Sequence, residues 1–344
     1  MRTIIFSLIA AMLTLAGSGA FAQGDADTGY HIIKRLNVGG EGGWDYLTVD
    51  NAARRLYISR STHVMVIDLD TDKVVGDIAN TPGVHGIAVA PELNRGFTSN
   101  GKADTSTIFD LKTLQVVGEV KTGGNPDCIV YDPASKRVFT FNGRSKDATV
   151  FDAASGKVVR TIALGGKPEY AATNGKGKLY VNIEDANEVV EIDASKPRVS
   201  RRFTLKRCEE PSGLGLDAVH GRVFSGCHNK VMTILETASG KVTAAMPIGA
   251  GVDGNGFDAG TGLAFSANGD GTLTVVGETS PGTFKVAQTV ATQPGARTMA
   301  IDPKSHNIYL PTAQFVPPKE PVQAGSKRRP VMVKDSFEVL VVGK

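Results

Sequence analysis

The sequence lacks the short motifs that mark the common hydrolases and redox enzymes. It contains no G-x-S-x-G elbow, no H-E-x-x-H pair and no C-x-x-C motif, so no motif predicts a catalytic residue. The net charge of +3 is too small to indicate nucleic-acid binding without clustered basic residues. Beyond the first 22 residues there is no apolar run of the ~20 residues that a membrane-spanning helix needs, and no sustained 3.6-residue period. These absences argue against a helical membrane protein and against a helical fold.

The N-terminal residues have the pattern of a secretory signal peptide. Arg2 supplies a positive charge, residues 4–16 form a short apolar region, and Ala20-Phe21-Ala22 is an A-x-A cleavage signature. No cysteine lies near the cleavage site, which argues against a lipid-anchored protein. We therefore predict a cleaved signal peptide at residues 1–22 and a mature protein that is located in the periplasm.

What the sequence does contain is a repeat of short strands and tight turns, and its 40 glycines suit such turns. The clearest copy has strands at 128–131, 137–142 and 148–152. One turn residue, which follows the first strand, can be traced along the chain at Asp50, Pro91, Asp132, Asn174, Asp217, Asp258 and Asp302. Its steps of 41 to 44 residues have the length of four short strands, which is the size of one β-propeller blade.

The seven turn residues predict an all-β fold, a seven-bladed β-propeller with four-stranded blades. The last blade has room for only three strands, which end at residues 337–342, so segment 30–36 is expected to pair with it as the fourth strand. Such an N-terminal strand removes two exposed sheet edges and closes the ring. We expect residues 23–344 to form one domain, with a proline-rich loop inserted at about 313–335, and the protein to be a monomer.

The repeat resembles that of the YVTN/YncE-like β-propellers. Residues 179–182 (LYVN) come close to the motif that names this family, and residues 56–59 (LYIS) are a looser version. The resemblance extends over about residues 30–344 and concerns architecture rather than chemistry. It implies an exported, non-catalytic scaffold for an unknown periplasmic protein or small ligand. One branch of such proteins has been linked with single-stranded DNA binding.

In a propeller, the loops that enter the first strands and leave the second strands gather around the mouth of the central channel. Ligand sites form preferentially at such concave places, so polar side chains there are candidates for ligand binding. They are Trp44, Asp45, Arg60, His85, Asn100, Asp127, Asn142, Glu169, Asn182, His228, Asp253, Asn268 and Arg297. Because Asp and Asn in loops commonly bond to their own backbone, each also has a turn-forming interpretation.

Two further functions fit the same loops. The oxygen-rich set suits a divalent metal in the central channel. The ligands predicted for it are Glu169, Asn182, Asp253 and Asn268. A metal-assisted, lactonase-type hydrolase would then use His85 or His228 as its general base. Single-stranded nucleic-acid binding is the other alternative, and it requires aromatic side chains beside a basic groove.

Two of the three cysteines are expected to meet in one blade. Cys208 enters the first strand of blade 5 and Cys227 leaves its second strand, and these strands are expected to be antiparallel neighbours. In an oxidising periplasm they are expected to form a disulfide, and a metal or redox role for Cys227 beside His228 is the alternative. Cys128 lies within an apolar strand and is expected to be a buried thiol.

Overall fold

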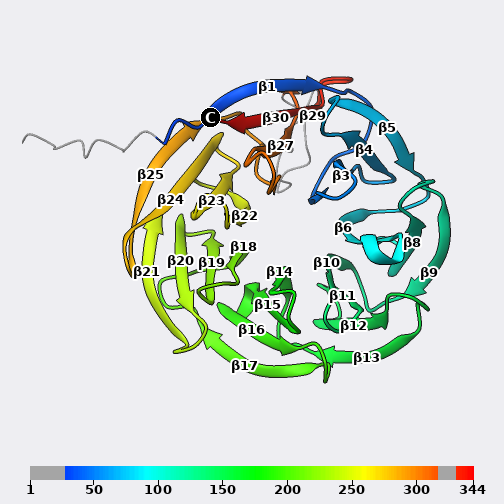
Figure 1. Cartoon of the computed structure of the whole chain (residues 1–344), viewed down its shortest axis with the longest axis horizontal. Coiled ribbons are helices and arrows are strands. Elements are labelled where there is room, and N and C mark those ends of the chain that lie inside the picture. Colours follow the sequence, from blue (N-terminus) through cyan, green and yellow to red (C-terminus); the bar gives the residue numbers. More distant parts are fainter. Residues whose placement is uncertain (1–27, 317–330) are drawn as a thin grey trace, which may run out of the picture.

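The computed structural model describes residues 28–316 and 331–344, which form a ring of seven four-stranded antiparallel sheets (Figure 1). Blades 1 to 3 contain β2 (Leu47–Asp50), β3 (Arg55–Ser59), β4 (Val64–Asp68), β5 (Lys73–Ile78), β6 (Val84–Ala90), β7 (Arg95–Asn100), β8 (Thr105–Asp110), β9 (Val116–Lys121), β10 (Pro126–Asp132), β11 (Arg137–Asn142), β12 (Asp147–Asp152) and β13 (Val158–Ala163). Blades 4 to 6 contain β14 (Pro168–Thr173), β15 (Lys178–Ile183), β16 (Glu188–Asp193), β17 (Arg198–Thr204), β18 (Pro211–Asp217), β19 (Arg222–Cys227), β20 (Val231–Glu236), β21 (Lys241–Pro247), β22 (Val252–Asp258), β23 (Leu263–Asn268), β24 (Thr272–Ser280) and β25 (Thr283–Ala291). The predicted seven-bladed β-propeller is confirmed; the predicted signal peptide at residues 1–22 lies outside the described residues.

Blade 7 is completed by the N-terminal strand. Its sheet has the order β1 (His31–Asn37), β30 (Glu338–Gly343), β27 (Ile308–Thr312) and β26 (Ala300–Ile301). The outermost strand β1 pairs with β30 in antiparallel fashion, and Figure 1 shows the two side by side at the rim. The N-terminal closure predicted from the sequence is therefore confirmed.

The repeated turn residues act as backbone caps. In blade 1, Asp50 accepts hydrogen bonds through Oδ1 from the backbone N–H groups of Ala52 and Ala53, both at 3.0 Å. The Asp132 and Asp217 carboxylates cap the corresponding turns of blades 3 and 5. A short side chain that bonds the backbone two or three residues ahead stabilises a tight turn, which explains why the anchors of the repeat are mostly Asp.

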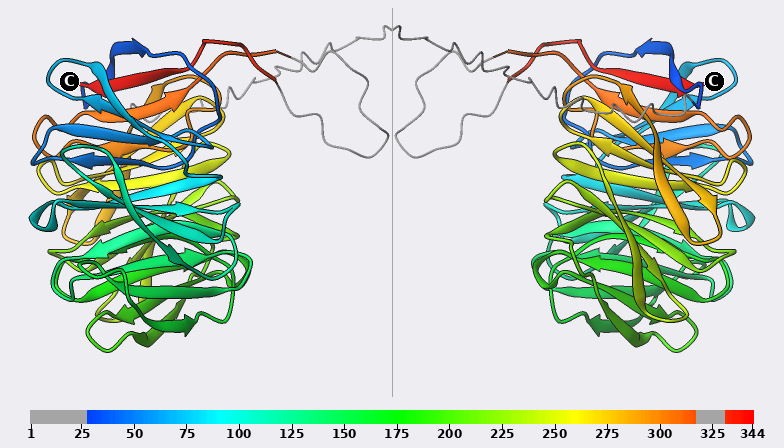
Figure 2. Two further views of the ribbon diagram at one scale, coloured as in Figure 1. Left: turned by 90° about the vertical axis from the view of Figure 1, so that its right-hand side faces the viewer. Right: turned by 90° about the vertical axis from the view of Figure 1, so that its left-hand side faces the viewer.

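The core lies between neighbouring blades. Phe139 and Phe141 of blade 3 are fully buried in one cluster with Leu179 and Val181 of blade 4. Because a neighbour covers each face of a blade, the second and third strands are apolar on both faces, and the outer strands are partly exposed. The side views in Figure 2 show these packed sheets as a short cylinder.

Arginines tie neighbouring blades together on the outside of this core. The guanidinium of Arg95 donates to the carbonyl of Ala153 at 3.3 Å, and that of Arg137 donates to the carbonyl of Ala194 at 2.6 Å. Where the ring closes, Arg54 of blade 1 donates from both Nη atoms to the Asp302 carboxylate of blade 7, at 2.7 Å each.

The connection between β27 and β30 carries a short hairpin in place of a tight turn. Its strands β28 (Phe315–Val316) and β29 (Val331–Met332) pair with each other and leave the ring on one side (Figure 2). Residues 317–330 of the predicted proline-rich insertion lie outside the described part of the chain. Within the described ranges, no helix has the length and hydrophobicity to cross a membrane.

The predicted disulfide between Cys208 and Cys227 is present in blade 5, and Cys128 is a buried free thiol.

We expect the double variant Cys208→Ala/Cys227→Ala to lose about 3 kcal/mol of unfolding free energy, because its unfolded chain is no longer constrained by the crosslink. Chemical denaturation with and without a reductant measures this. The reductant should destabilise the wild type and leave the variant unchanged; equal responses of both would contradict the assignment.

Candidate functional site

Seven structurally equivalent residues surround one end of the central channel. In blades 2 to 6 the equivalent position is fixed by strand pairing. One residue of the first strand pairs with the last residue of the second strand, as Pro126 pairs with Asn142, and the ring residue is the one that comes next along the chain. The repeat places the corresponding residues of blades 1 and 7 at the same level. We call these residues the mouth ring: Asp45, His85, Asp127, Glu169, Ser212, Asp253 and Arg297. The ring combines four carboxylates with one imidazole, one hydroxyl and one guanidinium group.

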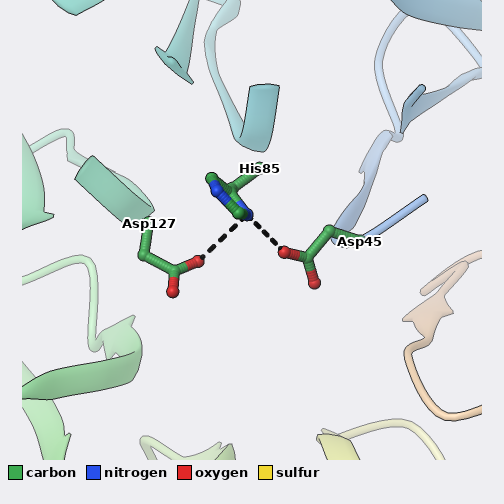
Figure 3. Close-up of side chains that lie close together, drawn as sticks. All are labelled: Asp45, His85 and Asp127. Carbon is green, nitrogen blue, oxygen red and sulfur yellow. Dashed lines mark hydrogen bonds and ion pairs between the residues drawn. The ribbon is translucent and has the colours of Figure 1, made fainter. Parts of the chain in front are cut away.

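Three members of the mouth ring from blades 1 to 3 converge on one point. The Nδ1 atom of His85 lies 2.6 Å from Oδ2 of Asp45 and 3.6 Å from Oδ1 of Asp127. Figure 3 shows the two carboxylates on either side of the imidazole. The side chains of His85, Asp45 and Asp127 are 31%, 21% and 14% exposed, so the cluster is mostly shielded but still open to the channel.

The close approach of these carboxylates disfavours their ionised forms and shifts the pKa values in the cluster. Burial, followed by the charges of Asp45 and Glu169, raises the pKa of Asp127 well above its usual range. Burial lowers the pKa of His85, but the hydrogen bond that His85 donates to Asp45 and the charge of Asp127 outweigh it and raise that pKa to about 9. The site therefore favours a positive charge between the two carboxylates.

The remaining ring members form two smaller groups. Asp253 accepts hydrogen bonds from Nε of Arg297 at 2.5 Å and from Oγ of Ser212 at 3.1 Å. Glu169 lies 3.2 Å from Nζ of Lys167. Arg297 pairs with Asp253, and Lys167 divides its charge between Glu169 and Glu184, which leaves Asp45 and Asp127 to share His85.

A small cavity lies beside the inner-strand residues that follow the ring. A volume of about 60 Å³ is lined by Tyr46, Tyr170 and Cys128 together with parts of the inner strands. The two tyrosine rings are 5.0 Å apart between centroids and pack against each other. This volume suits one or two small molecules such as water.

The four asparagines predicted at the mouth are buried inside the blades. Asn100, Asn142, Asn182 and Asn268 are all fully buried. Asn182 donates to the carbonyls of Ser212 and Gly213 and accepts from Ser225, so its amide is fully engaged. Asn268 donates to two threonine hydroxyls, and Asn100 and Asn142 have similar side-chain partners. The predicted metal ligand set of Glu169, Asn182, Asp253 and Asn268 is therefore not assembled, because both amides are bonded within the sheets.

Two other predicted ligands of blade 1 are structural. Arg60 is fully buried and its guanidinium donates to backbone carbonyls of the segment 39–42. Trp44 packs against Phe337 and Phe315, with centroid distances of 5.3 and 6.0 Å. The Arg60 guanidinium is therefore fully engaged inside the fold, whereas Trp44 is half-buried and its indole N–H has no hydrogen-bond partner.

His228 lies outside the mouth ring. Its Nδ1 atom is 2.9 Å from Oε2 of Glu210, and the two side chains are 42% and 63% exposed. With Glu184 they form a second, more open group of side chains that could hold a cation. The two histidines named for a hydrolase thus belong to different places.

Sequence reasoning missed Ser212 as a ring member, because neighbouring Glu209 and Glu210 are more conspicuous. The signal was present in the repeat, since Ser212 follows Pro211 as Asp127 follows Pro126 and Glu169 follows Pro168. Alignment of the blades by that residue would have identified the ring position.

Glu169 gives a pH-dependent test of this electrostatic arrangement. Burial raises its pKa to about 7, with Lys167 opposing the shift. Because the unfolded pKa is ~4.3, this group destabilises the fold progressively as the pH rises from about 4 to 7. In metal-free protein, Glu169→Gln is expected to change stability little at pH 4 and to raise it by about 1–2 kcal/mol at pH 8. Thermal melts at both pH values measure this, with the exposed Glu119→Gln on β9 as control; a variant that is less stable at pH 8 would contradict the prediction.

The comparisons with known proteins agree with the fold. The sequence profile of the YNCE-like beta-propeller family matches residues 46–177. None of the curated proteins compared with the chain matches it. Many solved structures are similar. Among them, a chain of Kuenenia stuttgartiensis hydrazine synthase superposes with a TM-score of 0.68 at 18% identity, over 78% of this chain and 92% of that one.

At that identity the structural likeness concerns the fold alone. The family match covers blades 1 to 3 and the first strand of blade 4, and the remaining blades repeat the same architecture. The chain is therefore a seven-bladed β-propeller, and its resemblance to the YNCE-like β-propellers is confirmed.

Proposed function

We propose that this chain is a non-catalytic binding propeller that recognises a positively charged ligand, or a positively charged group of a partner, at the mouth ring. The observation that carries the proposal is the excess of carboxylates there. Four carboxylates face one arginine, one histidine and Lys167, whose charge is shared with Glu184, and Asp127 keeps a buried Oδ1 atom without a hydrogen bond. Buried carboxylates destabilise a fold unless they are paired, so a cation from outside the chain would stabilise the site.

We further propose that the protein acts in the periplasm. The predicted signal peptide directs it there, and the Cys208–Cys227 disulfide suits an oxidising compartment. The negative charge of the ring argues against single-stranded nucleic acid as the ligand, because phosphates would be repelled by the carboxylates.

One observation favours a second candidate, a lactonase-type hydrolase. Asp45 bonds Nδ1 of His85, which is the arrangement that orients a histidine general base. Turnover of a lactone that is lost in His85→Gln would support this function over the binding role.

The test of the binding role compares the wild type with the triple variant Asp127→Asn/Glu169→Gln/Asp253→Asn. Thermal melts are recorded with spermidine, a lysine-rich peptide, divalent metals, inorganic phosphate and an oligothymidine. We expect at least one cationic probe to raise the Tm of the wild type but not of the variant, since binding to the native state alone stabilises it. The proposal fails if only the anionic probes bind, or if the variant responds as the wild type does.

A further inference from the structure

We propose that Asp45, His85 and Asp127 form a binding site for a divalent transition-metal ion of the Zn²⁺ type. The ligand atoms are Nδ1 of His85, Oδ2 of Asp45 and Oδ1 of Asp127. This inference deepens the proposed function and rests on it, because it names the cation that the mouth ring would take.

The geometry of the three atoms is close to that of a metal site. They all lie within 4.8 Å of one another. In a tetrahedral Zn²⁺ site with bonds of ~2.0–2.2 Å, the ligand atoms are about 3.4 Å apart. The distance from His85 to Asp127 is already 3.6 Å, and Asp45 at 2.6 Å would need to move back by less than one ångström.

The number of hydrogens at His85 also favours a metal ion as the group that pairs with both carboxylates. Nδ1 of His85 carries at most one hydrogen, and Asp45 accepts it. Asp127 Oδ1 lies on the other side of the same nitrogen, is buried, and has no hydrogen-bond donor. One hydrogen cannot satisfy two ionised carboxylates, whereas a dication in its place contacts all three ligand atoms and balances both negative charges.

The ligand types decide the class of metal. One imidazole nitrogen with two carboxylate oxygens suits Zn²⁺ and its first-row neighbours, whereas Ca²⁺ takes six to eight oxygen ligands and Mg²⁺ keeps an octahedral shell of oxygens. The side chains come from three successive blades and converge at the channel (Figure 3). Three protein ligands leave at least one coordination position open, as in zinc sites that bind a further ligand.

The position of His85 depends on a glycine in the neighbouring loop. A Cβ atom at Gly101 would lie 2.7 Å from Nε2 of His85 and 2.8 Å from Oδ1 of Asn125. Gly101→Ala therefore displaces the imidazole without removing any ligand, and it tests the geometry of the site separately from its composition.

The experiment measures Zn²⁺ affinity by competition with a chromophoric chelator and the Tm with Zn²⁺, Ca²⁺ and Mg²⁺. The wild type is compared with His85→Gln, Asp127→Asn and Gly101→Ala, after circular dichroism has confirmed that each metal-free variant is folded. His228→Gln is the matched control, since His228 belongs to the other histidine–carboxylate group. At a free Zn²⁺ concentration of about 100 times Kd, we expect the wild-type Tm to rise by roughly 5 °C.

We expect one Zn²⁺ per chain, a loss of affinity of at least about 100-fold in His85→Gln and at least about 10-fold in Asp127→Asn and Gly101→Ala. His228→Gln should retain the wild-type affinity, and Ca²⁺ and Mg²⁺ should leave the Tm unchanged. Loss of binding in His228→Gln instead of His85→Gln would overturn the site. If Zn²⁺ fails to bind while spermidine or the lysine-rich peptide still does, the metal proposal falls and the binding role stands; if no cation binds, both fall.

Discussion

Replacing Asp302 by Asn is expected to lower the free energy of unfolding by about 2–3 kcal/mol, because a buried carboxylate that bridges two blades loses its charge and Arg54 keeps only its pair with Asp70. The Asp302 side chain is 0% exposed and joins the last blade to the first through two hydrogen bonds of 2.7 Å from Arg54. It also accepts hydrogen bonds from Lys304 and Ser305 in its own turn. An amide keeps the shape of the side chain but removes the charge and one of the two acceptors.

Chemical denaturation of Asp302→Asn and the wild type measures this cost. The control is Asp72→Asn, which removes an exposed pair with Lys34 and should cost less than about 1 kcal/mol. A cost for Asp302→Asn as small as that of the control would show that Arg54 does not help to hold the closure.

The Arg54–Asp302 pair also predicts how the free energy of unfolding depends on pH. Hydrogen bonds from Arg54 and from its own turn outweigh burial and hold the pKa of Asp302 far below its usual value. A depressed pKa stabilises the fold above the unfolded pKa of ~3.9, and this stabilisation is lost as the pH falls through the folded pKa. The stability difference between wild type and Asp302→Asn should therefore be complete at pH 6–7 and shrink below about pH 4.

The fold was predictable because its signal is repeated. Six of the seven turn residues, such as Asp50 and Asp132, perform the same backbone capping, and all seven weak local signals confirm one another through their spacing. The disulfide was predictable for a related reason: once the blade is known, the loop that enters β18 and carries Cys208 lies beside the end of β19 that carries Cys227.

The candidate site was predictable only in part, because a position in a loop does not fix the direction of a side chain. Asp127 and Asn142 were equally plausible, yet Asn142 pairs with Pro126 and is buried between sheets. Successive residues of a strand point in opposite directions, so Asp127 faces away from the surroundings of Pro126. Which of two successive residues in the first strand faces the centre of the ring is decided by the register between the first and second strands, and the amino-acid sequence does not show that register.

Arg60 illustrates this limit most clearly, since a charged residue beside the mouth proves to be a core residue. We expect Arg60→Ala to lower the free energy of unfolding by about 3–5 kcal/mol, because it leaves a large cavity and several carbonyl groups without donors. The guanidinium donates to the carbonyls of Gly39, Gly40, Glu41 and Gly42. It also lies 3.6 Å from the centroid of the Phe337 ring, and burial lowers its pKa to about 10.

Arg60→Lys separates charge from geometry in this prediction. A lysine keeps the positive charge but has one ammonium group, which cannot reach four carbonyls at once or stack on Phe337 as a planar guanidinium does. If the fixed fork of donors holds the segment 39–42, Arg60→Lys should lose most of the stability that Arg60→Ala loses. The exposed Arg160→Ala, on outer strand β13, should change it by less than about 0.5 kcal/mol. Because this segment leads directly to Asp45, both Arg60 variants should also weaken cation binding at the mouth ring. Unaltered binding in a destabilised Arg60→Ala protein would show that Asp45 is positioned by its own strand alone.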